Sequence, residues 1–522
     1  MNPAQLQILG SRLASVADEM GAVLRRAASS PNIKERADCS AALFTANGEL
    51  LAQAEHIPVH LGSMPASVAA AIATGLTTEL MLNDPFAGGT HVNDLTMVAP
   101  VVADGVLLGW VANRAHHADV GGTAPGSMPP DALTVDEEGL RLSPTLVDAD
   151  SLARVVASSR TPDERRGDLD AQRGANELGV HRFVEIGGVE HFDEILDYGE
   201  RRMRAAIAAL PDGRWTFEDV LDSAGPRPEQ QTPTRIVVEV RVEGDAVTFD
   251  FTGTDAQRPG NVNAVEAVTV SAVAFAIRAV TDPSLPANGG TMRPVRVIAP
   301  AGTVVAAVPP VAVGAGNVEV SQRVADVCLG ALAQVAPERV GAASQGTMNN
   351  VLLGGSLAGQ DFVYYETIGG GQGGRPWADG MSGVHTAMTN TLDTPVEALE
   401  RALPLRVRRY GLRRGSGGAG AHPGGDGIWR ELEALAPTEV SLVTERRVTP
   451  PPGLAGGAPG AVGENWLLPG GDELRARRLP DKCTVHLQPG DVLRVLTPGG
   501  GGWGPAGSGP VDSRPHDAGP SA

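Results

Sequence analysis

Residues 88–122 read GGTHVNDLTMVAPVVADGVLLGWVANRAHHADVGG, an apolar run with Asp104-Gly105 near its middle and polar clusters at both ends. Asp-Gly is one of the strongest short-range signals for a two-residue hairpin turn. We therefore predict a β-hairpin over residues 95–113, in which positions whose numbers sum to about 209 face each other. Asn93 then pairs with His116, to within one or two residues.

Five polar side chains share the open end of this hairpin: His91, Asp94, His116, His117 and Asp119. Imidazole and carboxylate groups without a thiolate suit Zn, Fe(II) or Mn better than Cu(I). Two histidines and one carboxylate leave coordination sites open for water and substrate. The alternative is that these are loop polar groups that cap the strand ends. The HHAD sequence opposite H-x-x-D favours the metal site.

Two further polar clusters precede the hairpin. Asp38, in ERADCS, is a candidate carboxylate ligand or a strand-end cap. His56 and His60, in AEHIPVHLGS, are four residues apart, but Pro58 between them favours an extended turn over a helix. Each of these histidines is a ligand, a group hydrogen-bonded to a ligand, or an ordinary packed histidine.

The rest of the chain mixes helix and strand signals. Apolar residues at three- and four-residue steps over residues 6–23 predict an opening helix. Residues 42–54 predict a hairpin around Asn47-Gly48, and residues 235–254 alternate as paired strands do. We predict an α+β fold of several layers, with antiparallel and mixed sheets, flanking helices and Gly-rich loops. Further helices are predicted over residues 64–80, 161–210, 264–280 and 322–335, and further strands over 439–448, 483–488 and 491–498.

A Pro-rich segment, GPRPEQQTPT at residues 225–234, predicts a boundary near residue 226. It separates an N-terminal α+β region, residues 1–225, which carries the metal site, from a C-terminal α+β region, residues 226–505. The tail, residues 506–522, has little apolar content and is predicted to be disordered.

Composition excludes some classes of function. There are 61 Asp and Glu against 42 Lys and Arg, a formal net charge of -19, which argues against nonspecific binding to nucleic acid or anionic lipid. No apolar run approaches the roughly 18 residues of a membrane span, and the acidic N-terminus does not resemble a signal peptide. The three cysteines are far apart without a CxxC, which favours a reduced, cytoplasmic setting.

A glycine-rich segment, TIGGGQGGRP at residues 367–376, suggests phosphate binding. It lacks the GxxxxGK[ST] pattern of nucleotide-binding loops, which argues against ATP binding by this chain. A loop whose amides and Arg375 receive a substrate phosphoryl group is a better interpretation, with Glu366 as a neighbouring candidate catalytic residue. A structural turn explains the glycines equally well.

An ordered series of motifs covers nearly the whole chain and resembles the hydantoinase B family. This family comprises the partner subunits of ATP-dependent N-methylhydantoinases. It is similar to the C-terminal half of 5-oxoprolinase and more distantly to the large subunits of acetone and acetophenone carboxylases. The motifs are ERADCS, HIPVHLGSM, NDPFAGGTHVND, ANRAHHADVGGTAPGSMP, ERRGDLDAQRGAN, FTGTDAQRPGNVNA, GNVEVSQRVADV, SQGTMNN, YETIGGGQGGRP and SGGAGAHPGGDGIWRE.

The resemblance implies a heteromeric hydrolase of cyclic amides, in EC class 3.5.2. A hydantoinase A-type partner would use ATP to phosphorylate the substrate's carbonyl oxygen, and this chain would complete ring opening at a divalent metal. The carboxylase relatives hold their metal with an H-x-x-D pair and a later histidine, which fall here on His91, Asp94 and His116. Water bound to the metal, with its pKa lowered to about 7, would attack the phosphorylated carbon. His117 or Asp119 would orient ligands or act as general base.

One position departs from the family pattern, because Ala387 stands where the family usually has the histidine of HMTN. If that histidine moves protons or binds phosphate, this chain lacks it, and His385 replaces it only if the backbone geometry allows. Two other functions stay open. One is a carboxylase subunit, in which the phosphorylated intermediate meets CO2 derived from bicarbonate, and the other is a non-enzymatic assembly subunit with a structural metal.

Overall fold

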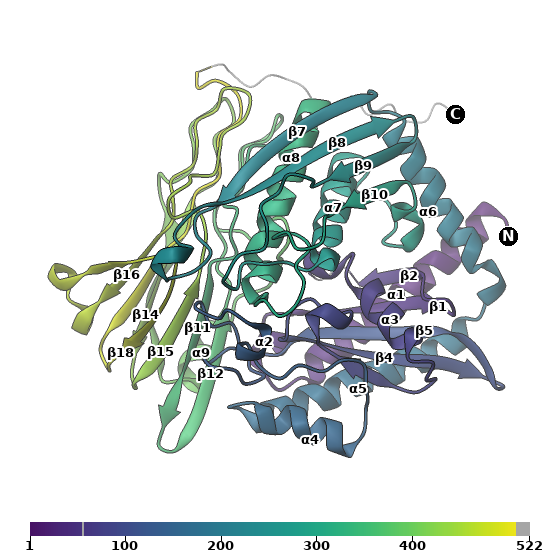
Figure 1. Cartoon of the computed structure of the whole chain (residues 1–522), viewed down its shortest axis with the longest axis horizontal. Helices are drawn as coiled ribbons and strands as arrows, with labels where there is room; N and C mark the ends of the chain where they lie inside the picture. Colours follow the sequence, from purple (N-terminus) through teal and green to yellow (C-terminus); the bar gives the residue numbers. More distant parts are fainter. Residues whose placement is uncertain (55–56, 508–522) are drawn as a thin grey trace.

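The predicted hairpin is present in the computed structural model, which describes residues 1–54 and 57–507 (Figure 1). Its strands are β4 (Asp94–Ala103) and β5 (Val106–His116). Asp104 and Gly105 have φ angles of 50° and 77°, as a type I′ turn requires of both central residues. His56 and residues 508–522 of the predicted tail lie outside the described residues.

The register of this hairpin differs by one residue from the prediction. Asp94, and not Asn93, lies opposite His116. The cause is an irregularity in the pairing of β4 with β5. Val101 lies opposite Gly109, but the next residue, Val102, lies opposite Leu107, so that β5 has one extra residue here and the register shifts by one.

The hairpin lies at the centre of a six-stranded sheet ordered β2-β1-β5-β4-β3-β6. Successive side chains of a strand point to opposite faces, and both faces are covered here. Leu43 faces α1 (Pro3–Ala27) and α5 (Pro162–Ile186), whereas Phe44 faces α3 (Met64–Ala73). The remaining strands are β1 (Cys39–Thr45), β2 (Leu50–Ala54), β3 (Leu80–Leu82) and β6 (Thr145–Leu146).

A second sheet, ordered β10-β9-β8-β7, packs against α7 (Glu266–Val280) and α8 (Ser321–Val335). Its buried side chains, such as Phe249, join an extensive apolar core with both helices. The predicted boundary near residue 226 lies in the loop between two paired strands of this sheet, and the division into two domains stays a prediction. The strands are β7 (Gly213–Leu221), β8 (Thr234–Glu243), β9 (Ala246–Asp250) and β10 (Val295–Ile298).

Two further sheets lie on the left of Figure 1, ordered β12-β11-β15-β18 and β13-β14-β19-β16-β17. Side chains from both, including Leu353 and Leu432, form one buried cluster. The strands are β11 (Asn350–Leu357), β12 (Gln360–Glu366), β13 (Leu405–Arg413), β14 (Gly427–Ala434), β15 (Thr438–Val443), β16 (Glu464–Leu468), β17 (Arg477–Leu479), β18 (Lys482–Leu487) and β19 (Val492–Leu496).

The predicted Gly-rich loops lie side by side as extended chains that hydrogen-bond to one another outside regular strands. The amide of Gly371, for example, donates to the carbonyl of Pro498 at 3.0 Å. A Cβ atom added at Gly500 would lie 2.1 Å from the carbonyl oxygen of Gln372, so only glycine permits this approach. The segments come from residues 369–374, 416–427, 453–460 and 499–504.

The predicted α+β fold of several layers is therefore confirmed. The helix predicted over residues 161–210 is interrupted at Gly187 and Gly188, which have φ angles of 61° and 76°.

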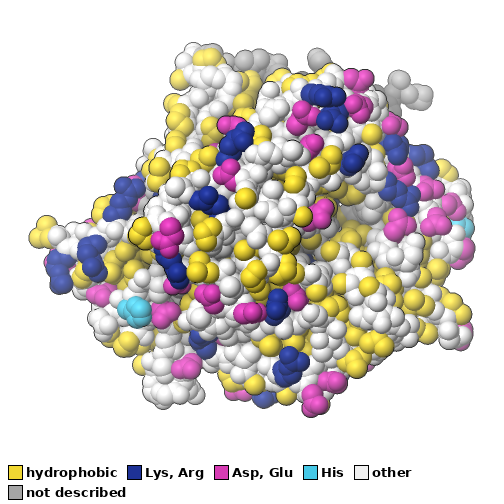
Figure 2. Space-filling model, in the orientation of Figure 1, with side chains coloured by type: hydrophobic (Ala, Val, Ile, Leu, Met, Phe, Trp, Pro, Cys, Tyr) yellow, Lys and Arg dark blue, Asp and Glu magenta, His cyan; other side chains and the backbone are white. Residues whose placement is uncertain are grey.

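No helix among the described residues is both long and apolar enough to cross a membrane. On the face in Figure 2, acidic and basic side chains are interspersed. The other helices are α2 (Pro31–Lys34), α4 (Ala149–Ser158), α6 (Phe192–Ile207) and α9 (Val396–Ala402).

Candidate metal centre

Three of the predicted ligands meet where the β4–β5 hairpin opens. His91 lies in the loop before β4, Asp94 begins β4 and His116 ends β5. Asp94 Oδ1 lies 3.0 Å from His91 Nε2 and 3.3 Å from His116 Nδ1. The three ligand atoms all lie within 4.8 Å of one another, and all three side chains are buried.

This arrangement fits one divalent cation. Ligand atoms about 2.0–2.2 Å from the same ion lie roughly 3.0–3.5 Å from one another. Asp94 Oδ1 is buried, and the polar groups beside it among the described residues are the rings of His91 and His116, an arrangement that one shared cation would satisfy. A donor set of two imidazoles and one carboxylate without thiolate suits Zn, Fe(II) or Mn.

The carboxyl group of Asp94 is held ionised. Burial raises its pKa. The neighbouring charge of His91 and the hydrogen bonds from His116 and His60 lower the pKa by more than burial raises it. The net result is a pKa well below the ordinary value of 3.8. The group therefore offers a charged oxygen to a cation at any pH near neutrality.

The second oxygen of Asp94 is fixed by its neighbours. Oδ2 accepts hydrogen bonds from Thr90 Oγ1 at 2.8 Å and from Asn317 Nδ2 at 3.2 Å, and His60 Nε2 lies 3.4 Å away. His60 Nδ1 in turn lies 2.9 Å from Ser40 Oγ. Contacts of this kind orient a ligand toward its metal. His60, left open between three roles by the sequence, therefore contacts a candidate ligand.

Asn317 was not singled out from the sequence. It comes from a π-helical turn, Gly316–Val320, directly before α8, and such turns frequently mark functional sites. Asn317 Nδ2 also lies 3.1 Å from His91 Nε2. The available signal was the motif GNVEVSQR, but spacing alone does not show that a turn of α8 reaches the hairpin.

A chain of contacts links the same turn to His116. The ring of Tyr365 stacks on the His116 ring, with centroids 4.6 Å apart. Tyr365 donates to Asn350 Oδ1 at 2.8 Å, and Asn350 Nδ2 donates to Glu319 Oε1 at 2.7 Å. Burial, with the charge of Glu445 in second place, raises the pKa of Glu319 to about 8. Glu319 is therefore mostly protonated at neutral pH.

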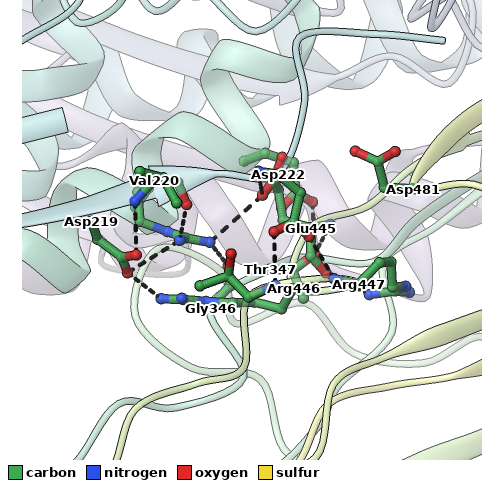
Figure 3. Close-up of polar contacts among 12 residues, drawn as sticks. Asp219, Val220, Asp222, Gly346, Thr347, Glu445, Arg446, Arg447 and Asp481 are labelled. Carbon is green, nitrogen blue, oxygen red and sulfur yellow. Dashed lines mark hydrogen bonds and ion pairs between the residues drawn. The ribbon is translucent and has the colours of Figure 1, made fainter. Parts of the chain in front are cut away.

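Behind this chain lies a buried network of charged residues (Figure 3). Thr347 Oγ1 accepts from the backbone amide of Glu445 at 3.1 Å. The carboxylate of Glu445 pairs with Lys482 at 2.5 Å, and Arg446 pairs with Asp219 at 2.6 Å. These contacts join the end of β7 to the segment after β15 and to the start of β18, and so hold the second and third sheets together.

A cavity of about 20 Å³ is lined by two of the three candidate ligands, Asp94 and His116. Such a volume holds about one water molecule, so a ring-shaped substrate requires the walls to move. Asp38 lines this cavity, but it does not belong to the group of three residues whose ligand atoms lie within 4.8 Å of one another. The polar lining residues are Asp38, His60, Asp94, His116, Asn317, Tyr365, Thr367 and Thr389.

His117 and Asp119 are not among the residues that line this cavity. His117 Nε2 lies 2.8 Å from Gln172 Oε1 of α5, and burial lowers the pKa of His117 to about 4. Asp119 pairs with Arg160 at 2.8 Å and accepts from the amide of Gly126 at 3.1 Å. Both side chains therefore hold neighbouring segments in place, and their catalytic roles stay predictions.

Glu366 also lies apart from the cavity lining. Arg430 donates to both of its oxygens, at 3.0 and 2.9 Å, and Tyr364 donates at 2.8 Å. Burial raises the pKa of Glu366, but the charge of Arg430 lowers it more, so that the net pKa is below the ordinary value. This carboxylate is thus saturated by a buried bidentate ion pair.

Arg375 and the glycine-rich loop also make internal contacts. Each amide from Gly370 to Arg375 donates to an oxygen of the protein. Arg375 Nη2 donates to the carbonyl of Asp379 at 3.0 Å. The loop amides are therefore not available to receive a phosphoryl group, which removes the reason given for that interpretation. A catalytic role of Arg375 stays a prediction.

The segment around Ala387 lies at the cavity, since Thr389 lines it. Ala387 has a φ of 54°, a left-handed conformation that is uncommon outside glycine. His385 is buried, and its Nε2 lies 3.4 Å from Thr391 Oγ1. Burial, aided by the charge of Arg36, lowers the pKa of His385 to about 3, so its ring is neutral.

The fold and the site define a multi-layer α+β protein with a candidate divalent-metal centre built on a hairpin. A family model described as Hydantoinase B/oxoprolinase matches residues 2–506. The chain belongs to this family, and the resemblance found in its motifs is confirmed.

Relatives extend over almost the whole chain. An uncharacterized protein of Methanocaldococcus jannaschii is 38% identical, over 97% of this chain and 91% of its own length. The 5-oxoprolinase 1 of Arabidopsis thaliana is 37% identical, over 96% of this chain but 42% of its own length. A putative D-/L-hydantoinase subunit of a Pseudomonas species is 31% identical, over 97% and 90%. The chain thus spans less than half of that 5-oxoprolinase and most of the hydantoinase subunit.

Solved structures share the fold. The ATP-dependent caprolactamase from Pseudomonas jessenii superposes with a TM-score of 0.89 at 27% identity, covering 97% of this chain and 91% of its own. A nucleotide-free acetone carboxylase superposes with a TM-score of 0.88, covering 96% and 76%. At 19% identity, the latter likeness shows the fold alone.

Proposed function

We propose that the chain is the catalytic subunit of an ATP-dependent cyclic amide hydrolase, of the N-methylhydantoinase or 5-oxoprolinase type. The observation that carries this proposal is the buried group His91, Asp94 and His116, in a chain of the hydantoinase B family. Its relatives support the substrate class, because hydantoins, 5-oxoproline and caprolactam are all cyclic amides.

The partner in this proposal is a hydantoinase A-type subunit. A ring amide resists hydrolysis because resonance makes its carbonyl carbon a poor electrophile. Phosphorylation of the carbonyl oxygen by the partner, with ATP bound there and not by this chain, removes that resonance. Zn, Fe or Mn held by His91, Asp94 and His116, with Asp38 as a further ligand, would supply a water molecule whose pKa is lowered to about 7.

The chain's own residues bind the reactants and hold protons. Water adds to the phosphorylated carbon, the ring C–N bond breaks, and the nitrogen takes up a proton. A second water releases inorganic phosphate from the resulting acyl phosphate, which leaves an open-chain amino acid derivative. His60 lines the cavity and contacts Asp94, and we assign it the role of holding these protons.

The other predicted residues then act at a distance from the reacting atoms. His117 and Asp119 orient the end of β5 and the loop after it through Gln172 and Arg160. Glu366 orients the end of β12 through its ion pair, and Arg375 holds the glycine-rich segment. Each supports the positions of groups that do line the cavity.

The test is to purify the chain with a hydantoinase A-type partner and to measure ATP-dependent consumption of hydantoins, 5-oxoproline and caprolactam. We expect consumption of one of these rings, with a divalent metal found by elemental analysis. His91→Ala should lower both the activity and the metal content. His181→Ala is a matched control, because His181 is an exposed histidine on α5 that pairs with Glu185.

Three outcomes would contradict the proposal. Consumption of a ketone that requires bicarbonate would identify a carboxylase subunit. Metal bound by an inactive complex that consumes no ring would leave a structural metal in an assembly subunit. ATP turnover by the isolated chain would contradict the division of labour between the two subunits.

A further inference from the structure

Arg36 is a buried cation behind the metal cavity that forms no ion pair with any carboxylate among the described residues. Its hydrogen bonds go to neutral oxygens. Nε donates to the Leu392 carbonyl at 3.3 Å, and Nη1 donates to the carbonyl of Tyr365. Nη2 donates to Thr367 Oγ1 at 2.5 Å and to Thr391 Oγ1 at 3.1 Å. The guanidinium group also lies 5.3 Å from the centroid of the Tyr365 ring. Two of its four hydrogen bonds therefore go to backbone carbonyls and two, both from Nη2, to threonine hydroxyl groups.

One of the two hydroxyl hydrogens of Thr367 and Thr391 is left free to donate to a third group. A guanidinium group only donates, so both oxygens accept from Arg36. The two hydroxyls lie 2.7 Å apart, and one of them donates to the other. His385 Nδ1 is buried without a hydrogen-bond partner among the described residues, so we place the single ring hydrogen of neutral His385 on Nε2, 3.4 Å from Thr391 Oγ1. Thr391 then accepts from His385 and donates to Thr367, and the remaining hydrogen belongs to Thr367. Thr367 lines the metal cavity.

A donor polarised by a buried cation binds best to an anionic oxygen. The cavity is the size of one water molecule and adjoins Asp94 and His116. The proposed reaction brings two such oxygens there, the hydroxide-sized nucleophile and an oxygen of the substrate's phosphoryl group. We infer that Thr367, oriented by Arg36 and Thr391, is the hydrogen-bond donor that binds an anionic oxygen in this cavity. This inference rests on the proposed function for the identity of the oxygen.

The experiment compares anion binding by the purified, metal-analysed chain and its Thr367→Val and Thr367→Ser variants. Fluoride serves as a probe of hydroxide size and inorganic phosphate as a probe of the phosphoryl group, followed by ¹⁹F and ³¹P NMR titration. Thr367→Val keeps the shape but removes the hydroxyl, and we expect at least one anion to bind about tenfold or more weakly. Thr367→Ser keeps a hydroxyl and should bind within about threefold of the original chain.

Controls separate a local effect from misfolding. Metal content should be the same in all variants. Thr367→Val and Thr269→Val each remove a buried, hydrogen-bonded hydroxyl group, so both should lower the midpoint of thermal unfolding, and binding is measured well below the lower midpoint. Thr269→Val removes another buried hydroxyl, which donates to the Val305 carbonyl at 2.6 Å outside the cavity, and should leave anion binding unchanged.

The two probes also identify the oxygen. Weaker binding of fluoride alone assigns Thr367 to the nucleophile, and weaker binding of phosphate assigns it to the substrate. Equal binding of both anions by the original chain and Thr367→Val, or no binding by the original chain, overturns the inference. If anion binding depends on Thr367 but the complex with its partner consumes no cyclic amide, the proposed function fails and the donor assignment stands.

Discussion

Lys482 offers a direct test of the buried charge network behind the metal centre. Its Nζ lies 2.5 Å from Glu445 Oε1 and 3.0 Å from Asp481 Oδ2, and all three side chains are buried. Lys482→Met keeps an unbranched side chain but removes the cation that the two carboxylates share, so that Glu445 keeps only a longer contact with Arg323, at 3.7 Å. Breaking a buried ion pair from one side costs about 3–5 kcal/mol. We expect the free energy of unfolding to fall by about that amount at pH 8.

The loss should depend on pH. Burial raises the pKa of Glu445 above its ordinary 4.5, although Lys482 lowers it, so removal of Lys482 raises it further. Below pH 4.5 the carboxyl group is protonated in the folded and unfolded chains, and it contributes no penalty. Above that pH the unfolded chain releases its proton more readily than the folded chain. The free energy of unfolding therefore decreases as the pH rises, until the pH reaches the raised pKa of the folded chain. The variant should therefore be less destabilised at pH 5 than at pH 8.

Urea denaturation followed by far-ultraviolet circular dichroism measures this effect at both pH values. Because a chain of this size need not unfold in two states, the shift of the first transition is compared between variants. Glu445→Gln added to Lys482→Met should restore part of the loss, because it removes one of the two buried negative charges that Lys482 balanced. Arg166→Met breaks an exposed pair with Asp163 and should change nothing measurable. A Lys482→Met loss below about 1 kcal/mol, or one equal at both pH values, would refute the reasoning.

Two other predictions concern the site and the glycine array. Asn317→Ala should lower metal affinity about 10- to 100-fold, because Asp94 Oδ2 loses a donor at 3.2 Å; unchanged metal retention after dialysis against a chelator would contradict this. Gly500→Ala should lower the thermal unfolding midpoint, since its Cβ would lie 2.1 Å from the Gln372 carbonyl oxygen. Gly10→Ala, in open space on α1, should be neutral or stabilising by up to about 1 kcal/mol, and similar midpoints for both variants would count against close packing of the array.

The hairpin and its ligands were predictable because they depend on local rules. A two-residue turn at Asp104-Gly105 fixes which residues meet at the open end, whatever the rest of the chain does. The error of one residue in register came from the irregularity beside Val102, which no short sequence pattern specifies. The error did not separate His91 from His116, because both lie within a few residues of the strand ends.

Groups that depend on the packing of distant segments could not be predicted in this way. Asn317 reaches Asp94 across 223 residues of sequence, from a π turn directly before α8. Tyr365 stacks on His116 because the end of β12 passes over the hairpin. The sequence predicts catalytic roles for His117 and Asp119 because they lie next to His116 in the chain. Yet His117, the first residue after β5, contacts Gln172 of α5, whereas His116 lines the cavity.

The division of roles between local and distant residues has a physical consequence for the metal centre. The three candidate ligands come from one hairpin, which could bring them close without the rest of the protein. Their orientation instead depends on Asn317 and Tyr365, from the C-terminal part of the chain. Since a carboxylate with one free and one hydrogen-bonded oxygen presents a single ligand atom, the contact of Asn317 with Asp94 Oδ2 leaves Oδ1 for the cation. The hairpin thus supplies the ligand types, and the assembled sheets determine their geometry.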